Sequence, residues 1–222
     1  MAIDWNDFFA PVWLSLKVSL IGSILVFVLA AATARWMAKR RFMGKSLLET
    51  VLLLPLVLPP TVIGFLLLML LGRRSWIGEA YEWFVDSPIV FSWIAAVIAA
   101  VVIAFPLAYR TMKAGFEDVD PELEKAARVL GANEWQVFRY VTAPLASRSL
   151  VAGFILGFAR ALGEFGATLM IAGNIPHRTQ TIPTAIYVAI DGGKQDLAWA
   201  WCIAMVLLSF VMLLLANGYS KR

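Results

Sequence analysis

Arg160 and Glu164 are two oppositely charged residues that lie four positions apart near the middle of a long apolar run. On a helix this spacing puts both side chains on one face. An unpaired charge at the centre of a membrane costs about 2.5–3.5 kcal/mol, so each residue needs the other or a wet cavity. Two interpretations follow. With Gly163 and Thr168, the pair lines or latches a transport pathway, or it is a buried structural ion pair.

Other residues that could do chemistry are scarce. His177 is the only histidine and Cys202 the only cysteine, which excludes a metal site with several histidine ligands and leaves a serine nucleophile without a convincing base. A nucleotide-binding P-loop around Gly44 would need a glycine where Lys39 stands. We therefore expect no catalytic residue, no metal and no cofactor. An intramembrane enzyme that uses Arg160 and Glu164 is the weaker alternative.

The composition indicates an integral membrane protein. Of the 222 residues 61% are hydrophobic, whereas soluble domains have about 45–50% apolar residues. Apolar runs of about 20 residues can cross the roughly 30 Å hydrocarbon core as helices. We expect an all-α, polytopic fold that forms one domain over residues 1–222. Its five predicted spans are residues 12–34, 47–71, 89–108, 150–172 and 197–217.

Two apolar segments are interrupted or short. Pro55, Pro59 and Pro60 remove backbone donors inside the second span, which predicts a kinked or broken helix that either shapes the bundle or borders a pathway. Residues 182–190 are apolar enough for a re-entrant or an interfacial segment.

The distribution of lysine and arginine predicts the orientation, because these residues are enriched in cytoplasmic loops. They gather after the first span, between the third and fourth spans, and at the end of the chain. This places the N-terminus outside, the C-terminus inside and the loop at residues 113–148 in the cytoplasm. With so few charges, we expect lipid and not nucleic acid as a partner. The cationic positions are Arg35, Lys39, Arg40, Arg41, Lys45, Arg110, Lys113, Lys125, Arg128, Arg139, Arg148, Lys221 and Arg222.

The 113–148 loop carries strong helix signals between Asp120 and Pro144. Asp120 is a good N-cap, and Pro121 suits the first helical position. Small and apolar residues then recur on one predicted helix face, and Gly131 ends the helix. A second short helix follows, so we expect helix, glycine hinge, helix. The face consists of Leu123, Ala126, Ala127 and Leu130. It predicts either docking on a partner or a solvated amphipathic helix.

The spacing of Ala126, Ala127, Gly131 and Pro144 resembles the cytoplasmic loop of ABC importer permease subunits. In that family the loop docks into a cleft on a separate ATPase. The family's glutamate before the two alanines is Lys125 here, with Glu124 one residue away. The resemblance implies a set of residues that couple to the ATPase, namely Glu124, Lys125, Ala126, Ala127, Leu130, Gly131 and Pro144.

The segment FARALGEFGATLMIAGNIPHRTQTIPTAIY is similar to the oxyanion branch of these type I importers, and most similar to the molybdate permeases. The resemblance implies a multi-pass permease of the cell inner membrane that acts as a homodimer. It also implies two ATP-binding subunits at the cytoplasmic face and a periplasmic or lipid-anchored oxyanion-binding protein. The permease itself would hydrolyse no ATP. Tungstate and sulfate or thiosulfate stay open as alternative substrates.

Overall fold

The computed structural model describes the backbone of residues 5–220 and the side chains of residues 5–214, and every regular element in this range is a helix. The predicted all-α class is confirmed, whereas Lys221 and Arg222, which the orientation argument used, lie outside the described residues. The elements are α1 (Trp5–Lys39), α2 (Lys45–Val57), α3 (Pro60–Leu71), α4 (Trp76–Val85), α5 (Trp93–Glu117), α6 (Pro121–Val129), α7 (Glu134–Val137), the π-helix η1 (Phe138–Thr142), α8 (Ala143–Leu145), α9 (Ser147–Leu162), α10 (Gly166–Ala172), α11 (Ile182–Asp191) and α12 (Gln195–Ser220).

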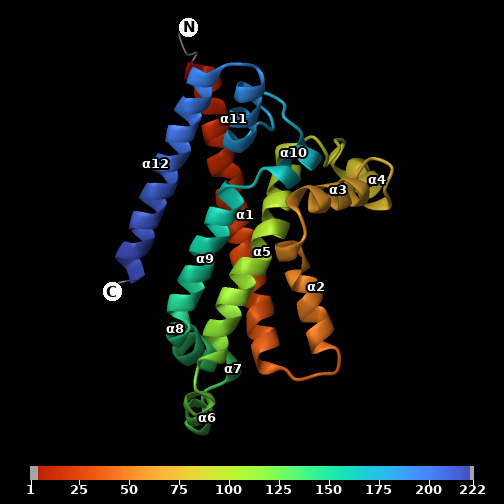
Figure 1. Cartoon of the computed structure of the whole chain (residues 1–222). Helices are drawn as coiled ribbons and strands as arrows, with labels where there is room; N and C mark the ends of the chain where they lie inside the picture. The colour runs from red at the N-terminus through yellow and green to blue at the C-terminus, as the bar shows by residue number, and fades with distance from the viewer. Residues whose placement is uncertain (1–4, 221–222) are drawn as a thin grey trace.

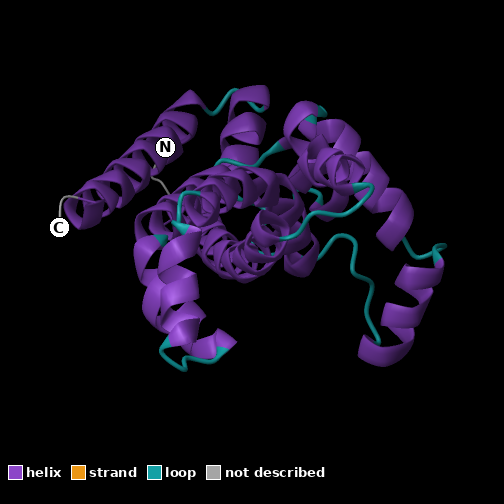
Figure 2. Cartoon of the chain, turned by 90° about the horizontal axis from the view of Figure 1, so that it is seen from below, coloured by secondary structure: helices purple, strands orange, loops and turns teal. Residues whose placement is uncertain are grey.

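Helices α1, α5 and α9 lie side by side and form the centre of the molecule (Figure 1, Figure 2). Small residues let these helices approach closely. A Cβ atom on Gly153 of α9 would lie 2.7 Å from the Met112 side chain and 3.2 Å from the Ala108 carbonyl oxygen of α5. A Cβ on Gly157 would lie 3.3 Å from Val26 of α1. Interhelical packing here depends on the absence of these side chains.

The second predicted span is broken, as its prolines indicated. Helix α2 ends at Val57, Leu58 and Pro59 are extended, and Pro60 begins α3. The two helices meet at an angle of 113°. Pro59 and Pro60 lack the backbone N–H groups that a continuous helix would need, so the chain turns where they occur. After α3 a short helix, α4, lies in the connection to α5. Its Ser75 side chain accepts a hydrogen bond from Gly78 N and caps it.

The fourth predicted span, residues 150–172, is wrong as a single helix. Helix α9 ends at Leu162, residues 163–165 are non-helical, and α10 is a separate helix that packs against α3 and α5. The crossing with α3 is tight, because a Cβ on Gly64 would lie 2.7 Å from Met170 Cβ and 2.8 Å from Ala167 Cα. The chain therefore leaves the axis of α9, and α10 packs against α3 of the broken second span.

Helices α11 and α12 complete the fold. The apolar segment 182–190 forms α11, whose residues Ile182 and Ala185 are fully buried. Helix α12 packs mainly against α11, and Trp201 Nε1 donates a hydrogen bond to the Phe8 carbonyl oxygen at 3.0 Å. In its most apolar window only 11% of the residues are buried. In Figure 1 α12 diverges from the central bundle toward its end.

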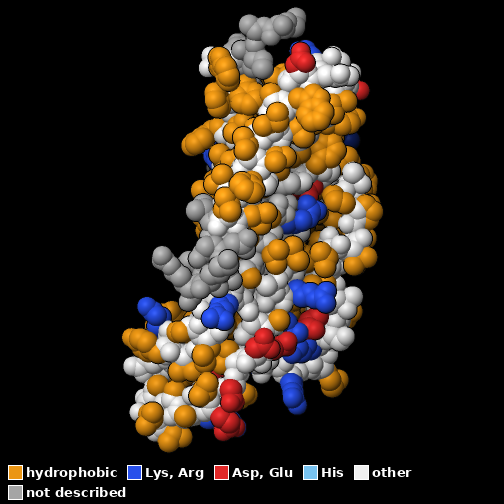
Figure 3. Space-filling view, turned by 60° about the vertical axis from the view of Figure 1, so that its left-hand side comes forward, with side chains coloured by type: hydrophobic (Ala, Val, Ile, Leu, Met, Phe, Trp, Pro, Cys, Tyr) orange, Lys and Arg blue, Asp and Glu red, His pale blue; other side chains and the backbone are white. Residues whose placement is uncertain are grey.

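By length and composition, α1, α5 and α12 can each cross a membrane. Two bent pairs also qualify when each is taken together, α2 with α3 and the α7–α8 segment with α9, the second bent by 71°. In the space-filling view, hydrophobic side chains cover most of the visible upper surface, and charged side chains gather toward the lower end (Figure 3). That lower end holds α6 and α7 (Figure 1).

Candidate functional site

The helix–hinge–helix prediction for the Asp120–Pro144 segment is confirmed. The Asp120 side chain accepts a hydrogen bond from Glu122 N at 2.9 Å and caps α6, with Pro121 in the first turn. Gly131 has φ +90°, a left-handed conformation that glycine adopts without strain, and it turns the chain after α6. Asn133 and Gln136 then form a reciprocal capping box at the start of α7.

Glu124 is the buried residue of α6 and connects this helix to the bundle. Its side chain is only 7% exposed, and Thr142 Oγ1 donates a hydrogen bond to Glu124 Oε1 at 2.5 Å. Lys39, at the end of α1, donates a hydrogen bond to the other carboxylate oxygen. Arg35 Nη1 of α1 lies 3.3 Å from Oε1 and Arg128 Nη2 of α6 lies 3.6 Å from Oε2. A buried carboxylate needs such partners.

The orientation of Glu124 decides which face of α6 is free. Leu123 is 49% exposed and Leu130 is 87% exposed, and Ala126 is exposed between them. Ala127 lies on the Glu124 side and is only partly exposed. The predicted four-residue face is therefore divided, with three members outward and Ala127 turned toward the bundle. Leu123, Ala126 and Leu130 are therefore the members of this face that the rest of the described chain leaves exposed.

The two remaining coupling candidates lie on the surface. Lys125 Nζ forms an ion pair with Glu122 at 2.7 Å, and both side chains are exposed. Pro144 is exposed in α8, which continues the helical run of α7 and η1 without an intervening loop. The structure therefore gives Lys125 and Glu124 different environments, and Glu124 is the one held inside the protein.

Arg128 and Glu134 join α6 to α7 across the Gly131 hinge. Arg128 Nε and Nη2 donate hydrogen bonds to the two Glu134 carboxylate oxygens at 2.5 and 3.1 Å. This pairing lowers the pKa of Glu134 below its ordinary value of 4.5 and raises the pKa of Arg128. Bidentate geometry fixes the relative orientation of the two groups. The Arg128–Glu134 ion pair therefore joins α6 to α7 at neutral pH.

Arg160 and Glu164 do meet, but not on one continuous helix. Arg160 Nη1, in the last turn of α9, donates a hydrogen bond to Glu164 Oε2 at 2.7 Å. Glu164 lies in the break, and its Oε1 accepts a hydrogen bond from Ala167 N at 2.9 Å, which caps the start of α10. The Glu164 side chain is 1% exposed and that of Arg160 is 31% exposed. One carboxylate thus ties both helices together, a second role that spacing alone did not predict.

Of the predicted helix-break residues, Pro60 lies close to the start of α10. A Cβ on Gly166 would be 3.2 Å from Pro60 Cβ, so the breaks in the second and fourth predicted spans face each other. Pro55 stays inside α2. Gly163 is exposed beside the break, whereas Thr168 is buried in α10. The structure therefore groups the pathway candidates with Pro59 and Pro60.

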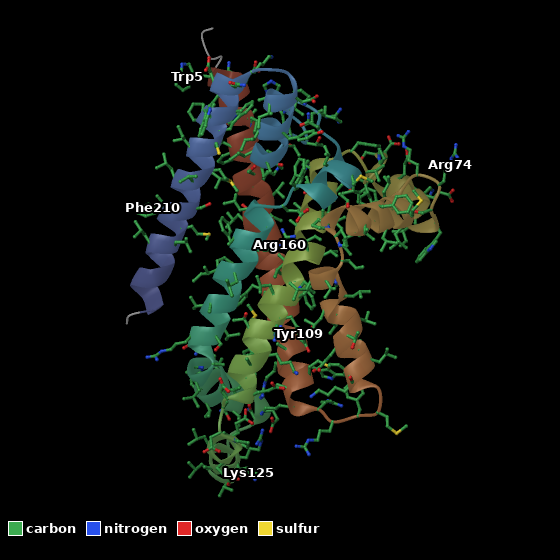
Figure 4. The ribbon with its side chains drawn as sticks, in the orientation of Figure 1. Trp5, Arg74, Tyr109, Lys125, Arg160 and Phe210 are labelled. Carbon is green, nitrogen blue, oxygen red and sulfur yellow. The ribbon has the colours of Figure 1, made fainter. Side chains whose placement is uncertain are left out.

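The coupling candidates lie apart from this group. In Figure 4, Lys125 lies at the lower end of the molecule and Arg160 near its middle. Sequence reasoning named neither Arg35 and Lys39 nor Thr142 as site residues. The first two stand four residues apart at the end of a long apolar run, a spacing that indicates one helix face aimed at a common anion. Among residues 5–220, no group of three His, Cys, Asp or Glu side chains is arranged to hold a metal.

Curated relatives match nearly the whole chain. The chain is 53% identical to YvgM of Bacillus subtilis (strain 168), whose name assigns it provisionally to molybdenum transport, over 96% of this chain and 93% of that protein. It is 46% identical to the molybdenum transport system permease protein ModB of Escherichia coli (strain K12), over 95% and 94% of the two chains. A sulfate transport system permease protein, CysW of Synechococcus elongatus, is 37% identical over 86% of this chain and 65% of its own.

Solved structures share the fold at low sequence identity. A bacterial ABC transporter involved in alginate import matches with a TM-score of 0.78 at 17% identity, over 97% of this chain and 79% of that chain. The MetNI methionine ABC transporter matches with a TM-score of 0.72 at 14% identity, over 95% and 93% of the two chains. The predicted fold relationship to ABC importer permeases is confirmed.

These comparisons also decide the class of protein. The relatives are permease subunits, which confirms the prediction of a permease against an intramembrane enzyme. The apolar helices accordingly belong to a multi-pass protein of the inner membrane. The family model for binding-protein-dependent transport system inner membrane components matches residues 27–222, and the chain belongs to this family.

Proposed function

We propose that this chain is the membrane-spanning subunit of an importer that moves molybdate into the cytoplasm by alternating access. Two copies form the pathway, two ATPase subunits bind ATP at the cytoplasmic face, and a periplasmic or lipid-anchored protein delivers the oxyanion. The names of the relatives at 53% and 46% identity support molybdate. Sulfate permeases are less similar, at 37% and 34% identity.

The proposed arrangement in the membrane has five crossings. The bent pair α2 with α3 counts as one crossing and α9 with α10 as another, in addition to α1, α5 and α12, while the α7–α8 segment stays with the cytoplasmic loop. The end that holds α6 also holds the cationic end of α1 and the basic loops, which favours a cytoplasmic location for this end. The N-terminus is then outside and the C-terminus inside.

The exposed apolar face of α6 is the observation that carries the coupling role. Leu123, Ala126 and Leu130 project away from the bundle, while Glu124 fixes the opposite face to α1. A short helix with an apolar outer face and an ionic inner face is suited to dock into a cleft on a partner. Movement of the ATPase then passes through Glu124 to Arg35 and Lys39, and so to the long helix α1.

Arg160 is the proposed contact with the pathway. Its side chain is partly exposed although it lies at the end of an apolar helix, and Gly163 is exposed beside it. A cation at this depth is offset by water or by an anion in transit. Glu164 and Thr168 are buried, so we assign them the role of holding the break in shape rather than of lining the path.

The docking role is tested with Ala126→Trp. The bulky side chain on the exposed face of α6 holds the helix off its cleft, so we expect a folded permease that no longer co-purifies with the ATPase. Ala80→Trp is the matched control, because Ala80 is an exposed alanine of α4, a helix that lies apart from α6 in Figure 1. Normal co-purification and substrate-stimulated ATP hydrolysis by Ala126→Trp would refute the docking assignment.

The substrate is tested by uptake into proteoliposomes that contain the permease, the ATPase and the binding protein. We expect ATP-dependent accumulation of molybdate that sulfate at equal concentration reduces little. Preferential accumulation of sulfate would show that sulfate, and not molybdate, is the substrate. Competition by tungstate measures how far the two metal oxyanions are distinguished.

A further inference from the structure

A cavity of about 360 Å³ lies between the N-terminal half of α1, the start of α5 and the loop that follows α10. It is distinct from the Arg160 break and from α6. Lys17 and Arg178 line it together with His177, and no aspartate or glutamate is among the lining residues. The walls are largely aromatic, with Trp13, Phe91 and Trp93 among them. The cavity is therefore lined by cationic and aromatic side chains, without an acidic side chain among its lining residues.

The two principal cations of this cavity have no carboxylate partner within the described residues. Lys17 Nζ lies 3.7 Å from the centroid of the Trp93 ring, an interaction that orients the ammonium group and leaves its charge in place. Neither Lys17 nor Arg178 takes part in an ion pair within residues 5–214, whereas His177 Nε2 lies 2.9 Å from Asp7. Two cations on one cavity, with no carboxylate among the described residues paired to either of them, favour an anion.

Two residues of the cavity wall have a left-handed backbone conformation. Phe91 and His177 both line the cavity, and both have left-handed backbone, with φ of 58° and 60°. A bulky residue such as Phe91 rarely takes this conformation, and where one does it often marks a functional site. Phe91 N donates a hydrogen bond to the Ile171 carbonyl oxygen at 2.9 Å. A Cβ on Gly173 would lie 3.1 Å from the Phe91 ring, so this glycine admits the ring.

We infer that this cavity receives a small tetrahedral oxyanion at the outer end of the permease, before the ion reaches the break at Arg160. The inference rests on the proposed function for its direction of transport. Lysine and arginine are the side chains that bind such anions, and the cavity has room for one with part of its water shell. Transit requires weak binding, so we expect the anion to exchange readily from this cavity.

Binding is tested without transport by measuring the acylation rate of Lys17, resolved by peptide mass spectrometry, in delipidated permease in detergent. We expect molybdate to protect Lys17, with an about tenfold lower rate when its concentration is about ten times the Kd. Chloride at equal ionic strength should not protect. A parallel arm uses nanodiscs of phosphatidylglycerol without molybdate. Protection by the lipid alone, or by neither, overturns the inference, since a headgroup site or no site would then be present.

Transport is tested with Lys17→Gln combined with Arg178→Gln. We expect uptake at subsaturating molybdate to fall about tenfold or more, as loss of one strong charged contact suffices for that factor. Arg74→Gln is the matched control, because Arg74 is an exposed cation in the α3–α4 turn that does not line the cavity (Figure 4). Unchanged uptake by the double variant overturns the inference. Absence of molybdate uptake by the unaltered protein would refute the proposed function instead, and the acylation measurement would still report on the site.

Discussion

The Arg160–Glu164 pair allows a test that separates a structural role from a transport role. Arg160→Met leaves a carboxylate that is 1% exposed with a single remaining donor, Ala167 N at 2.9 Å. Removing one partner of a buried pair typically costs about 3–5 kcal/mol. Arg160 itself is 31% exposed, so water weakens the pair and we place the cost at the lower end, about 3 kcal/mol.

The second substitution has to preserve the cap of α10. Glu164→Leu would leave Ala167 N without its acceptor, which adds about 1–3 kcal/mol to the cost and obscures the charge effect. Glu164→Gln keeps an oxygen for Ala167 N and removes only the charge. The variant with both Arg160→Met and Glu164→Gln should therefore recover most of the stability lost in Arg160→Met. The double-mutant cycle should give a coupling free energy of about 2 kcal/mol.

The assay combines equilibrium unfolding in detergent micelles with ATP-dependent molybdate uptake in proteoliposomes. If the pair switches between two arrangements during transport, the double variant regains stability but not uptake, because the switch needs both charges. Uptake at the unaltered level by the double variant would show that the pair is structural only. A coupling free energy near zero would show that the 2.7 Å contact contributes nothing to the fold.

Three further outcomes follow from other contacts. Glu124→Gln keeps an acceptor for Thr142 but not the charge that holds Lys39, so ATP hydrolysis should continue while uptake falls several-fold, and equal loss of both would contradict this. Gly153→Val forces α9 away from α5 and should reduce folded yield severely, as overpacking costs about 1–3 kcal/mol or more, and a normal yield on size-exclusion chromatography would oppose it. The Arg128 hydrogen bond lowers the pKa of Glu134 below 4.5, so the stabilisation that this ion pair provides is present above pH 4.5 and is lost as pH falls through the lowered pKa. ATPase binding in a pull-down should therefore be constant from about pH 8 to about pH 6.

Local signals predicted much of the fold. The cap at Asp120, the hinge at Gly131 and the break at Pro59 depend on one residue's conformational preference and the atoms next to it, so they could be recognised without the tertiary structure. The end of α9 was not recognised, because apolar residues continue past Leu162 at a density that suits a span. What divides the segment is the close crossing of α10 with α3, which only the folded chain provides.

The orientation of α6 could not be predicted from the spacing of its apolar residues either. A face of leucines and alanines is usually turned inward, yet here Glu124 is turned inward, because Arg35, Lys39 and Thr142 from distant parts of the chain surround it. The pattern located the coupling segment and its small residues. It did not show which of them are free to meet a partner.

Helix α12 meets so little of its own chain that its sequence is constrained by affinity for lipid more than by shape. Exchanges among apolar residues on its exposed side, such as Leu207 or Phe210, would therefore pass almost unnoticed in an isolated subunit. Any such exchange that impairs the protein in cells reports on a neighbouring molecule. Substitutions along the exposed side of α12 therefore test contacts with neighbouring molecules rather than contacts within the chain.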